Sequence, residues 1–456
     1  MFYFREKELE TINAFADNKA SKAMAIYGRR RSGKTALILE YYNKAGQNRC
    51  VYYQCSSFLY KTCLDDFIRI IHAHIQGTEL LDSMKSFKDV FLLLTKLDVN
   101  NQIFVIDEFP FLAKKDENVA VEFQWIIDHG LGSNKLVLLG SSLSFMKHQI
   151  SDREAPLYGR FDVAMEIKPF SFSEVHHLFP VFEDAVAVYA RTGGVAKYVM
   201  LYLNASSIQD ADENILFDPS GQLFTESEAL LMQELREVST YISILRALGT
   251  SEKEAGQISD KCAMDPRTIF PYLNKLKDLD VISVMENQFM DQRKKRYYIS
   301  DLFFRFHYTF IEPNISMITA LGKKSIPYIL SELYDEYLGF VYEQIIRSEC
   351  YNYGLTEKIP FMPITTGKWW GNISENGIWK ESEIDLVAFD KKSVILGECK
   401  YRNKAIGKKE YDLLKTKSSF VPVGDRDVYF LLAAKNGFTD EVKEIKDPRL
   451  ILVDKI

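Results

Sequence analysis

The sequence lacks the cysteine and histidine spacings of a zinc-binding or disulfide-stabilised protein. Its seven histidines offer no ligand pattern, and its six cysteines include no CxxC pair. Isolated cysteines of this kind are more often reduced core thiols than disulfides or metal ligands. We therefore expect reduced thiols at positions 50, 55, 63, 262, 350 and 399.

Long apolar runs, internal repeats and low-complexity tracts are also lacking. No apolar run approaches membrane-spanning length, and the first ten residues, MFYFREKELE, are charged instead of forming a basic segment followed by an apolar one. The sequence therefore predicts a cytoplasmic protein with no membrane partner.

Charge of one sign does not dominate the chain, but it is unevenly distributed. The 456 residues carry a net charge of -6 and are 47% hydrophobic, which is ordinary for about three folded domains. Eight acids and one arginine lie between positions 210 and 237, whereas seven basic residues and one acid lie between 391 and 409. The acidic stretch predicts a linker or solvated loop, and the basic stretch a surface that holds phosphates.

The first third of the chain alternates apolar strands with helical patterns. This alternation is typical of a parallel sheet with crossover helices, so we expect an α/β fold there. The expected strands are Ala23 to Tyr27, Cys50 to Gln54, Ile103 to Ile106 and Leu136 to Leu139.

The strongest motif, GRRRSGKT, follows the first of these strands and opens a helical pattern. It matches the phosphate loop G-x-x-x-x-G-K-[ST], in which backbone N–H groups surround phosphate oxygens. Lysine then reaches the β and γ phosphates, and threonine binds magnesium. The motif predicts ATP and Mg2+ as ligands, held by Gly28, Arg31, Ser32, Gly33, Lys34 and Thr35.

Two later strand ends are expected to complete this nucleotide site. VIDEF places Asp107 where it would bind magnesium and Glu108 where it would activate the attacking water. LLGSS places Ser141 and Ser142 after another strand, where either would sense the γ phosphate. A solvated acid and ordinary turn serines are the alternatives for Glu108 and for this pair.

A second cluster is predicted near the carboxyl terminus, in EIDLVAFDKKSVILGECKY. A hairpin turning at Lys391 and Lys392 pairs residues whose numbers sum to 783, which sets Asp385 opposite Glu398. Lys400 shares their face because side-chain direction in a strand has a period of two. Two facing carboxylates would hold Mg2+ or Mn2+, and the lysine would position a water. The alternative is a cross-strand salt-bridge network without a metal.

Residues 241–311 have the pattern of a winged helix. Tyr241 to Leu248 and Glu254 to Cys262 predict two helices, and a third is expected with Asp265 as its cap. A hairpin with a basic tip follows. Arg267, Lys275 and the cluster Arg293 to Arg296 would contact DNA phosphates, unless the segment is a lid or a protein contact.

Nearly the whole chain resembles the archaeal-type ATPases of the AAA+/STAND group of P-loop proteins. The matching stretches are FREKELE, GRRRSGKT, VIDEF, LLGSS, PLYGR, KPFSFSEV and TGGVAKYV. The resemblance implies that Arg160 of PLYGR acts as a trans-acting or sensor arginine at the γ phosphate. Ala196 stands where the family often has proline, and Phe161 where it often has a second arginine.

The carboxyl-terminal residues resemble a PD-(D/E)XK nuclease core. The resemblance makes Asp385, Glu398 and Lys400 its catalytic set and adds Glu343 as a helical acid that binds metal. It also implies the connector DLFFRFHYTFIEPN and the tryptophan pair of GKWWG, with Lys368 where arginine is commoner. We expect Trp369 and Trp370 to be packed instead of stacking on bases.

These inferences divide the chain into a P-loop parallel-sheet domain, a helical and winged-helix domain, and an α/β restriction-endonuclease-like domain. The expected protein hydrolyses ATP and regulates a metal-dependent nuclease acting on DNA. The alternatives are a nucleotide-switched DNA- or protein-binding regulator that does not cut, and an ATPase scaffold for a protein partner or a homo-oligomer. The expected bounds are 1–205 for the ATPase domain with its short helical lid, 206–237 for the linker, 238–325 for the winged helix and connector, and 326–456 for the nuclease-like domain.

Overall fold

The computed structural model describes residues 3–45, 49–56, 59–114, 116–289, 295–375 and 377–454. These residues form two compact units. The first unit comprises residues 1–170 with 195–197, and the second comprises 171–194 with 198–456. Within the described part of the chain, no helix has the length and apolar character that crossing a membrane requires.

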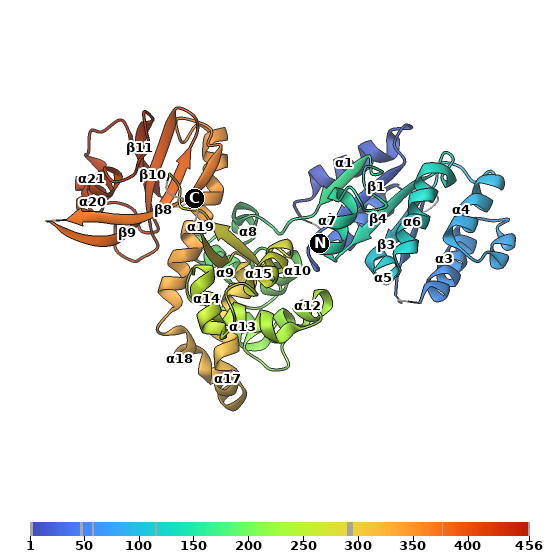
Figure 1. The fold of residues 1–456 in the computed structure, drawn as a ribbon, viewed down its shortest axis with the longest axis horizontal. Helices are drawn as coiled ribbons and strands as arrows, with labels where there is room; N and C mark the ends of the chain where they lie inside the picture. Colours follow the sequence, from blue (N-terminus) through green and yellow to red (C-terminus); the bar gives the residue numbers. More distant parts are fainter. Residues whose placement is uncertain are drawn as a thin grey trace. The chain divides into compact units, whose positions relative to one another are not determined.

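A five-stranded parallel sheet forms the centre of the first unit, with strand order β2-β3-β4-β1-β5 (Figure 1). Strands β3 and β4 are buried along their whole length, which is usual where helices cover both faces of a parallel sheet. The predicted strands and their parallel pairing are confirmed. The strands are β1 Ala23–Tyr27, β2 Cys50–Gln54, β3 Ile103–Asp107, β4 Lys135–Gly140 and β5 Val163–Glu166.

The helices of the first unit connect these strands and close two apolar cores. Ser86 begins one of them by accepting a hydrogen bond from the Asp89 N–H, a standard amino-terminal cap. The helices are α1 Glu6–Asp17, α2 Lys34–Ala45, α3 Tyr60–His74, α4 Phe87–Lys96, α5 Phe109–Ala113, α6 Glu117–Trp125 and α7 Leu143–Ser151, with shorter turns η1 Glu79–Ser83 and η2 Ile126–Gly130.

The second unit begins with short helices that include the acidic stretch. This stretch is not a solvated loop, because α11, η3 and α12 occupy most of it and two of its acids are buried. Asp212 accepts hydrogen bonds from Arg191 and Tyr202, and Glu226 accepts one from Tyr198. The elements are α8 Phe172–Leu178, α9 Phe182–Thr192, α10 Ala196–Leu203, α11 Ile208–Ala211, η3 Asp212–Leu216 and α12 Glu226–Glu234.

Three helices and an antiparallel hairpin occupy the segment for which a winged helix is predicted. They are α13 Val238–Leu248, α14 Ala255–Cys262, α15 Ile269–Asp278, β6 Ile282–Met285 and β7 Arg296–Ile299. The predicted start of the third helix is wrong. Asp265 accepts from the Arg267 and Thr268 N–H groups in a turn, and the helix begins only at Ile269. Arg293 and Lys294 of the predicted basic tip lie outside the described residues.

A helical connector, buried over residues 302–311, leads from this hairpin to the last sheet. It contains α16 Leu302–Phe306, η4 His307–Ile311, η5 Glu312–Asn314, α17 Ile315–Leu321, η6 Gly322–Ser325, α18 Ile326–Leu330 and the long helix α19 Tyr334–Leu355. Helix α19 packs against β8, β9 and β10 of the sheet that follows.

The last sheet is mixed and has strand order β12-β11-β10-β9-β8 (Figure 1). Strand β9 is antiparallel to both neighbours, whereas β10, β11 and β12 are parallel. Trp369 and Trp370 of β8 are buried, which confirms packing as their role. The elements are β8 Thr365–Glu375, β9 Ile378–Phe389, β10 Ser393–Lys400, α20 Lys408–Ser418, β11 Asp427–Ala434, α21 Asp440–Lys443 and β12 Leu450–Asp454.

Candidate functional site

The phosphate loop lies between the end of β1 and the start of α2. Gly28 has φ 151°, and a Cβ atom added there would stand 2.3 Å from the carbonyl oxygen of Ile167. Gly33 has φ 98°, another conformation that L side chains rarely adopt. Glycine is therefore required at both ends of the loop for local steric reasons.

Lys34 lies against the backbone of the loop. Its Nζ donates to the carbonyl oxygens of Gly28 and Arg29, each at 2.9 Å, and the side chain is buried. Burial lowers the pKa of Lys34 to about 8, although the carboxylates of Glu108 and Asp107 act in the opposite direction. The loop thus holds a buried cation whose present partners are backbone carbonyls, which a phosphate can replace.

Thr35 and Asp107 are brought together as predicted. The Thr35 hydroxyl donates to Asp107 Oδ2 at 2.8 Å, and the hydroxyl of Tyr52 donates to the same oxygen at 2.8 Å. A hydroxyl beside a carboxylate at the carboxyl ends of β1 and β3 is the oxygen donor set that Mg2+ prefers. Tyr52 was not among the predicted residues, because one tyrosine in an apolar strand carries no motif.

Glu108 and Ser141 contact each other at the neighbouring strand ends. Ser141 donates from its hydroxyl to Glu108 Oε2 at 2.6 Å and from its backbone N–H at 3.3 Å. Glu108 has φ 55°, a left-handed conformation, where it precedes helix α5. The serine thus holds the carboxylate that was predicted to activate water.

Two contacts from distant parts of the first unit support the loop. Arg5, which is buried, donates to the carbonyl oxygens of Ser32 at 3.3 Å and Lys168 at 2.7 Å. The carbonyl oxygen of Arg31 accepts from the Lys197 N–H at 3.2 Å. The stretch FREKELE was recognised as a motif, but the supporting role of Arg5 was not.

Arg160 lies in an ion pair outside the loop. Its Nε is 3.2 Å from Asp128 Oδ2, and its Nη1 donates to the Tyr158 carbonyl. Its role at a γ phosphate stays a prediction.

The second candidate site lies where β9 and β10 pair. The observed partners from Phe389 with Val394 to Leu386 with Gly397 all sum to 783, so the predicted register is confirmed over these pairs. Asp385 lies one residue beyond them, and its Oδ2 accepts from the Cys399 N–H at 3.0 Å.

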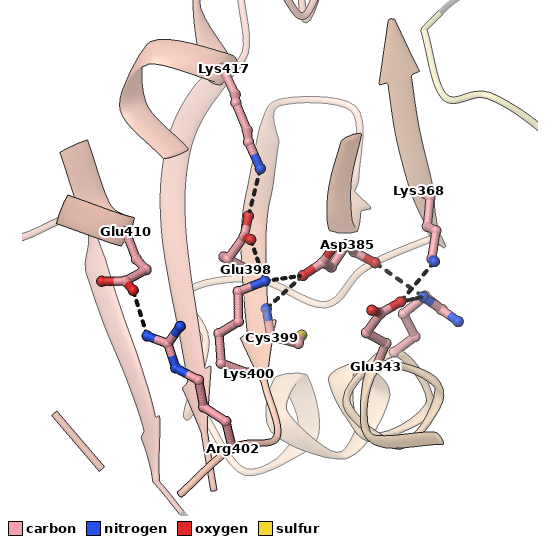
Figure 2. A network of polar contacts seen from close by, with 10 residues as sticks. Glu343, Lys368, Asp385, Glu398, Cys399, Lys400, Arg402, Glu410 and Lys417 are labelled. Carbon is pink, nitrogen blue, oxygen red and sulfur yellow. Dashed lines mark hydrogen bonds and ion pairs between the residues drawn. The ribbon is translucent and has the colours of Figure 1, made fainter. Parts of the chain in front are cut away.

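Two lysine side chains contact the carboxylates of this site, and one of them contacts both (Figure 2). Lys400 Nζ is 2.6 Å from Glu398 Oε1 and 3.7 Å from Asp385 Oδ2. Lys417 of α20 approaches the other oxygen of Glu398 at 3.0 Å. We refer to Asp385, Glu398 and Lys400 as the carboxylate–lysine cluster. Lys417 was missed because helix α20 carries no motif.

Burial strongly perturbs the cluster. Asp385 is 4% exposed, and its pKa is raised to about 8 by burial, then by the carboxylates of Glu343 and Glu398. Burial alone would lower the pKa of Lys400, but Asp385 and Glu398 outweigh this effect and raise it. Burial and the neighbouring carboxylates therefore disfavour the charged form of Asp385, and a cation bound beside it would favour that form.

Glu343 of α19 is engaged by other cations. Lys368 Nζ lies 2.7 Å from its carboxylate and Arg347 Nη1 lies 3.6 Å away, as Figure 2 shows for Lys368. No group of three or more histidine, cysteine, aspartate or glutamate residues suited to a metal occurs in the described part of the chain. The donor set at this site is thus two carboxylates, and Glu343 as a metal ligand stays a prediction.

The parallel sheet, the phosphate loop and the Thr35–Asp107 pair define a P-loop ATPase domain. Residues 2–201 match the family model described as an ATPase domain predominantly from Archaea. The structure also resembles the Walker-type ATPase PABY2304 of Pyrococcus abyssi, with TM-score 0.51 and 19% identity over 67% of this chain and 96% of that one. The similarity to the ORC2 protein of Aeropyrum pernix is weaker, with TM-score 0.46 and 14% identity over 70% of this chain and 95% of that one.

The family follows from a full-length relative. The uncharacterized protein MJECL04 of Methanocaldococcus jannaschii is 30% identical over an alignment 454 positions long, which covers 95% of this chain and 96% of that protein. This chain belongs to the same family. Residues 307–412 match a second family model, described as archaeal and bacterial proteins of unknown function, and this segment contains the carboxylate–lysine cluster.

Proposed function

We propose that this protein hydrolyses ATP in its first unit and cleaves DNA with a divalent metal ion in its second. The ATPase proposal is carried by the 2.8 Å contact between Thr35 and Asp107 beside the buried Lys34. Lys34 would hold the β and γ phosphates, and Glu108, oriented by Ser141, would accept a proton from the attacking water. Thr35 and Asp107 would bind Mg2+.

The nuclease proposal is carried by the convergence of the carboxylate–lysine cluster. A divalent ion held by Asp385 and Glu398 would polarise a phosphodiester and lower the pKa of a bound water. The donors fit a hard cation, since both are carboxylates and the pKa of Asp385 is raised by its carboxylate neighbours as well as by burial. Lys400 would then move from the carboxylates toward the water or the charge that develops on the phosphate.

We also propose that residues 238–325 form a winged helix and connector that contacts DNA. Arg267 and Lys275 of the α15 region would contribute phosphate contacts. On the hairpin, Lys295 is 2.6 Å from Glu286 and Arg296 is 2.7 Å from Glu381, so these two cations would have to exchange partners.

One observation favours a second function, that of a nucleotide-switched regulator that binds DNA or protein without cutting. Glu398 already has a lysine at each oxygen, Lys400 at 2.6 Å and Lys417 at 3.0 Å. A network neutralised in this way can be purely structural.

Cleavage assays on linear, branched and single-stranded DNA separate the two functions. We expect the wild type to nick or cut DNA with Mg2+ or Mn2+, in the presence of ATP, of ADP or of no nucleotide. Asp385→Asn and Lys400→Ala should abolish cutting while ATP hydrolysis persists. Asp425→Asn, an exposed acid on the same unit, serves as the matched control.

Equal behaviour of wild type and both variants on every DNA would remove the nuclease proposal. Crystals soaked in manganese supply an independent check, because the proposal requires anomalous density between Asp385 and Glu398.

A further inference from the structure

A cavity of about 440 Å³ lies within the second unit and opens beside the carboxylate–lysine cluster. Lys400 lines it from β10, Lys368 from β8, Arg305 from α16, and Glu343 from α19. Pockets that bind small ligands have volumes of roughly 300–1,000 Å³, and one water takes up about 30 Å³ of liquid. The space thus suits a group the size of a nucleotide better than a single water.

Arg305 is the most unusual group in the wall of this cavity. The residue is 4% exposed, and its guanidinium carbon stands 3.3 Å from the centre of the Phe340 ring. Its Nε and Nη1 are buried and make no hydrogen bond with any residue in the described ranges. Burial lowers the pKa of Arg305 to about 10, so it remains charged at neutral pH. A buried guanidinium with unused N–H groups is costly unless a ligand or solvent satisfies them.

The other cations that line the cavity already have carboxylate partners. Arg296 pairs with Glu381, Arg402 with Glu410, and Lys400 with Glu398. Lys368 is 2.7 Å from Glu343 and 3.5 Å from Glu252. No ion pair to Arg305 is found among the residues that the structure describes.

The acidic residues in the cavity wall do not form an ion pair with Arg305 within the described part of the chain. Glu252 and Glu343, which act electrostatically on Arg305, are the two carboxylates that Lys368 holds. Glu336 and Glu383 are solvent-exposed residues of the lining, where water screens their charge. Lys253 lies close enough to Arg305 to have its own pKa lowered to about 8, by burial first and then by Lys261 and Arg305. Arg305 therefore contributes two N–H groups to the inner wall, Nε and Nη1, that donate to no carboxylate among the described residues.

We propose that this cavity binds a phosphate group of a nucleic-acid strand, with Arg305 as the main donor. The proposal rests on the proposed nuclease function, since it takes the strand to be the one whose scissile bond lies at Asp385 and Glu398. Guanidinium N–H groups match phosphate oxygens in geometry and charge. Lys400 belongs to both the cavity wall and the cluster, so a strand held by Arg305 would lie beside the lysine that pairs with both carboxylates. Arg305 is thus a positioning residue for the strand.

The test measures binding of a fluorescent single-stranded oligonucleotide by the full chain in EDTA, where no metal-dependent cutting occurs. Arg305→Met, which keeps an unbranched apolar side chain but removes the guanidinium, should weaken binding at least about five-fold. It should also reduce the slope of log K against log salt by about 0.7, the value for one lost phosphate contact on a single strand. Arg305→Lys should have an intermediate effect. Lys96→Met removes an exposed charge from the first unit and should leave both the affinity and the slope unchanged.

Two further experiments distinguish a strand phosphate from a free anion and do not depend on the folding of a variant alone. Inorganic phosphate should compete with the oligonucleotide on the wild type and lose this effect on Arg305→Met. Selenate soaked into wild-type crystals should give an anomalous peak within hydrogen-bond distance of Arg305, a result that does not depend on any variant. Absence of that peak overturns the proposal. A peak combined with unchanged strand affinity in Arg305→Met also overturns it, because the cavity then holds a free anion and not a strand.

Failure of this proposal is distinguishable from failure of the nuclease function. If the wild type cuts DNA in an Asp385-dependent way but Arg305→Met binds it normally, only the cavity proposal falls. If no DNA is cut but Arg305→Met loses strand affinity, the nuclease function falls, and Arg305 binds a strand phosphate in a protein that does not cut DNA.

Discussion

Lys34 and Asp385 are both buried, and each has a pKa of about 8, reached from opposite directions. Burial removes the water that stabilises a charge, so it lowers the pKa of an ammonium and raises that of a carboxyl. Each group therefore lies close to its titration point at physiological pH in the ligand-free protein. A ligand of opposite charge would restore the ordinary charged form of each.

For Lys34, we expect proton uptake when ATP binds. The free lysine loses its proton as pH rises through about 8, whereas a bound polyphosphate favours the ammonium form. ATP affinity should therefore fall above pH 8, and binding at pH 8.5 should take up a fraction of one proton. Calorimetry in two buffers of different ionisation enthalpy measures this uptake. Lys34→Arg stays charged throughout and should show none, and a wild type without uptake would contradict the assignment.

For Glu108, we expect binding and turnover to separate. Glu108→Gln keeps the shape and an acceptor for the Ser141 hydroxyl, but it removes the basic oxygen. Hydrolysis should slow by roughly 10²-fold or more, the usual contribution of a general base, while ATP affinity stays within about three-fold. Steady-state hydrolysis and calorimetry give the two values. An equal loss of both would assign Glu108 to binding.

For Asp385, we expect the carboxylate to cost stability. A carboxyl whose pKa is raised on folding contributes no penalty at low pH, and its penalty grows as pH rises from about 4 to about 8. Asp385→Asn keeps the volume and an acceptor for the Cys399 N–H, so it should stabilise the second unit at pH 9 by on the order of 1–3 kcal/mol and have less effect at pH 5. Denaturant unfolding in EDTA tests this sign, with Asp425→Asn as the exposed control. Destabilisation at pH 9 would show that the charged network is structural.

At the scale of elements, the phosphate loop is positioned by close packing between backbones. Gly28 ends β1 against Ile167, the residue after β5, and Arg5 links the start of α1 to the loop carbonyl of Ser32. These contacts come from three separate stretches of the first unit. The loop conformation is therefore a property of the surrounding elements as well as of its own glycines.

Gly28→Ala tests this packing. The new Cβ meets the Ile167 oxygen at 2.3 Å, so β1 or β5 must shift, and we expect a loss of about 2–4 kcal/mol in the free energy of unfolding. Gly77→Ala is the matched control, because Gly77 also has a positive φ, +73°, but has open space around it. Its cost should be about 1 kcal/mol, from backbone strain alone. Similar costs at both positions, measured by urea unfolding, would show that the Ile167 contact is unimportant.

At the scale of the whole molecule, the chain divides into two compact units with separate cores. The cores around β1–β5 belong to the first unit, and the core around β8–β12 belongs to the second. The phosphate loop lies entirely in the first unit, and the carboxylate–lysine cluster with its adjoining cavity lies entirely in the second. Each site can therefore be altered without dismantling the core that holds the other.

Calorimetry should show this division as two unfolding transitions. ATP with Mg2+ at 100 times its dissociation constant stabilises the unit that binds it by about 2.7 kcal/mol, so one transition should move up by several degrees. Lys34→Ala should abolish the shift and leave the other transition in place. Arg449→Ala, an exposed residue of the second unit, should leave the ATP shift intact. A single transition that moves as a whole with ATP would indicate that the two units unfold cooperatively.

The features that could be predicted from the amino-acid sequence are those that depend on residues close together in the chain. The parallel strands were predictable from the alternation of apolar strands and helical patterns, and the phosphate loop from its glycine positions. The β9–β10 register was predictable from a two-residue turn. Each of these signals acts over a few residues. Reduced cysteines followed from their spacing, and all six are free thiols. Local pattern misjudged two points. Asp265 caps a turn before the helix, and the acidic stretch is helical because Arg191 and two tyrosines bury its acids.

The side chains that complete each site come from distant parts of the chain, and the folded structure brings them together. Tyr52 reaches Asp107, Arg5 reaches the loop, and Lys417 reaches Glu398 across 19 residues or more. Arg305 is an ordinary basic residue in an aromatic segment of the sequence. Its significance comes from its place beside a cavity, where its buried Nε and Nη1 have no hydrogen-bond partner among the described residues. The burial of a side chain and its hydrogen-bond partners depend on how many elements pack together, so no short sequence pattern encodes them. The sequence motifs therefore identified the candidate site residues, whereas packing determined their protonation states and their neighbours.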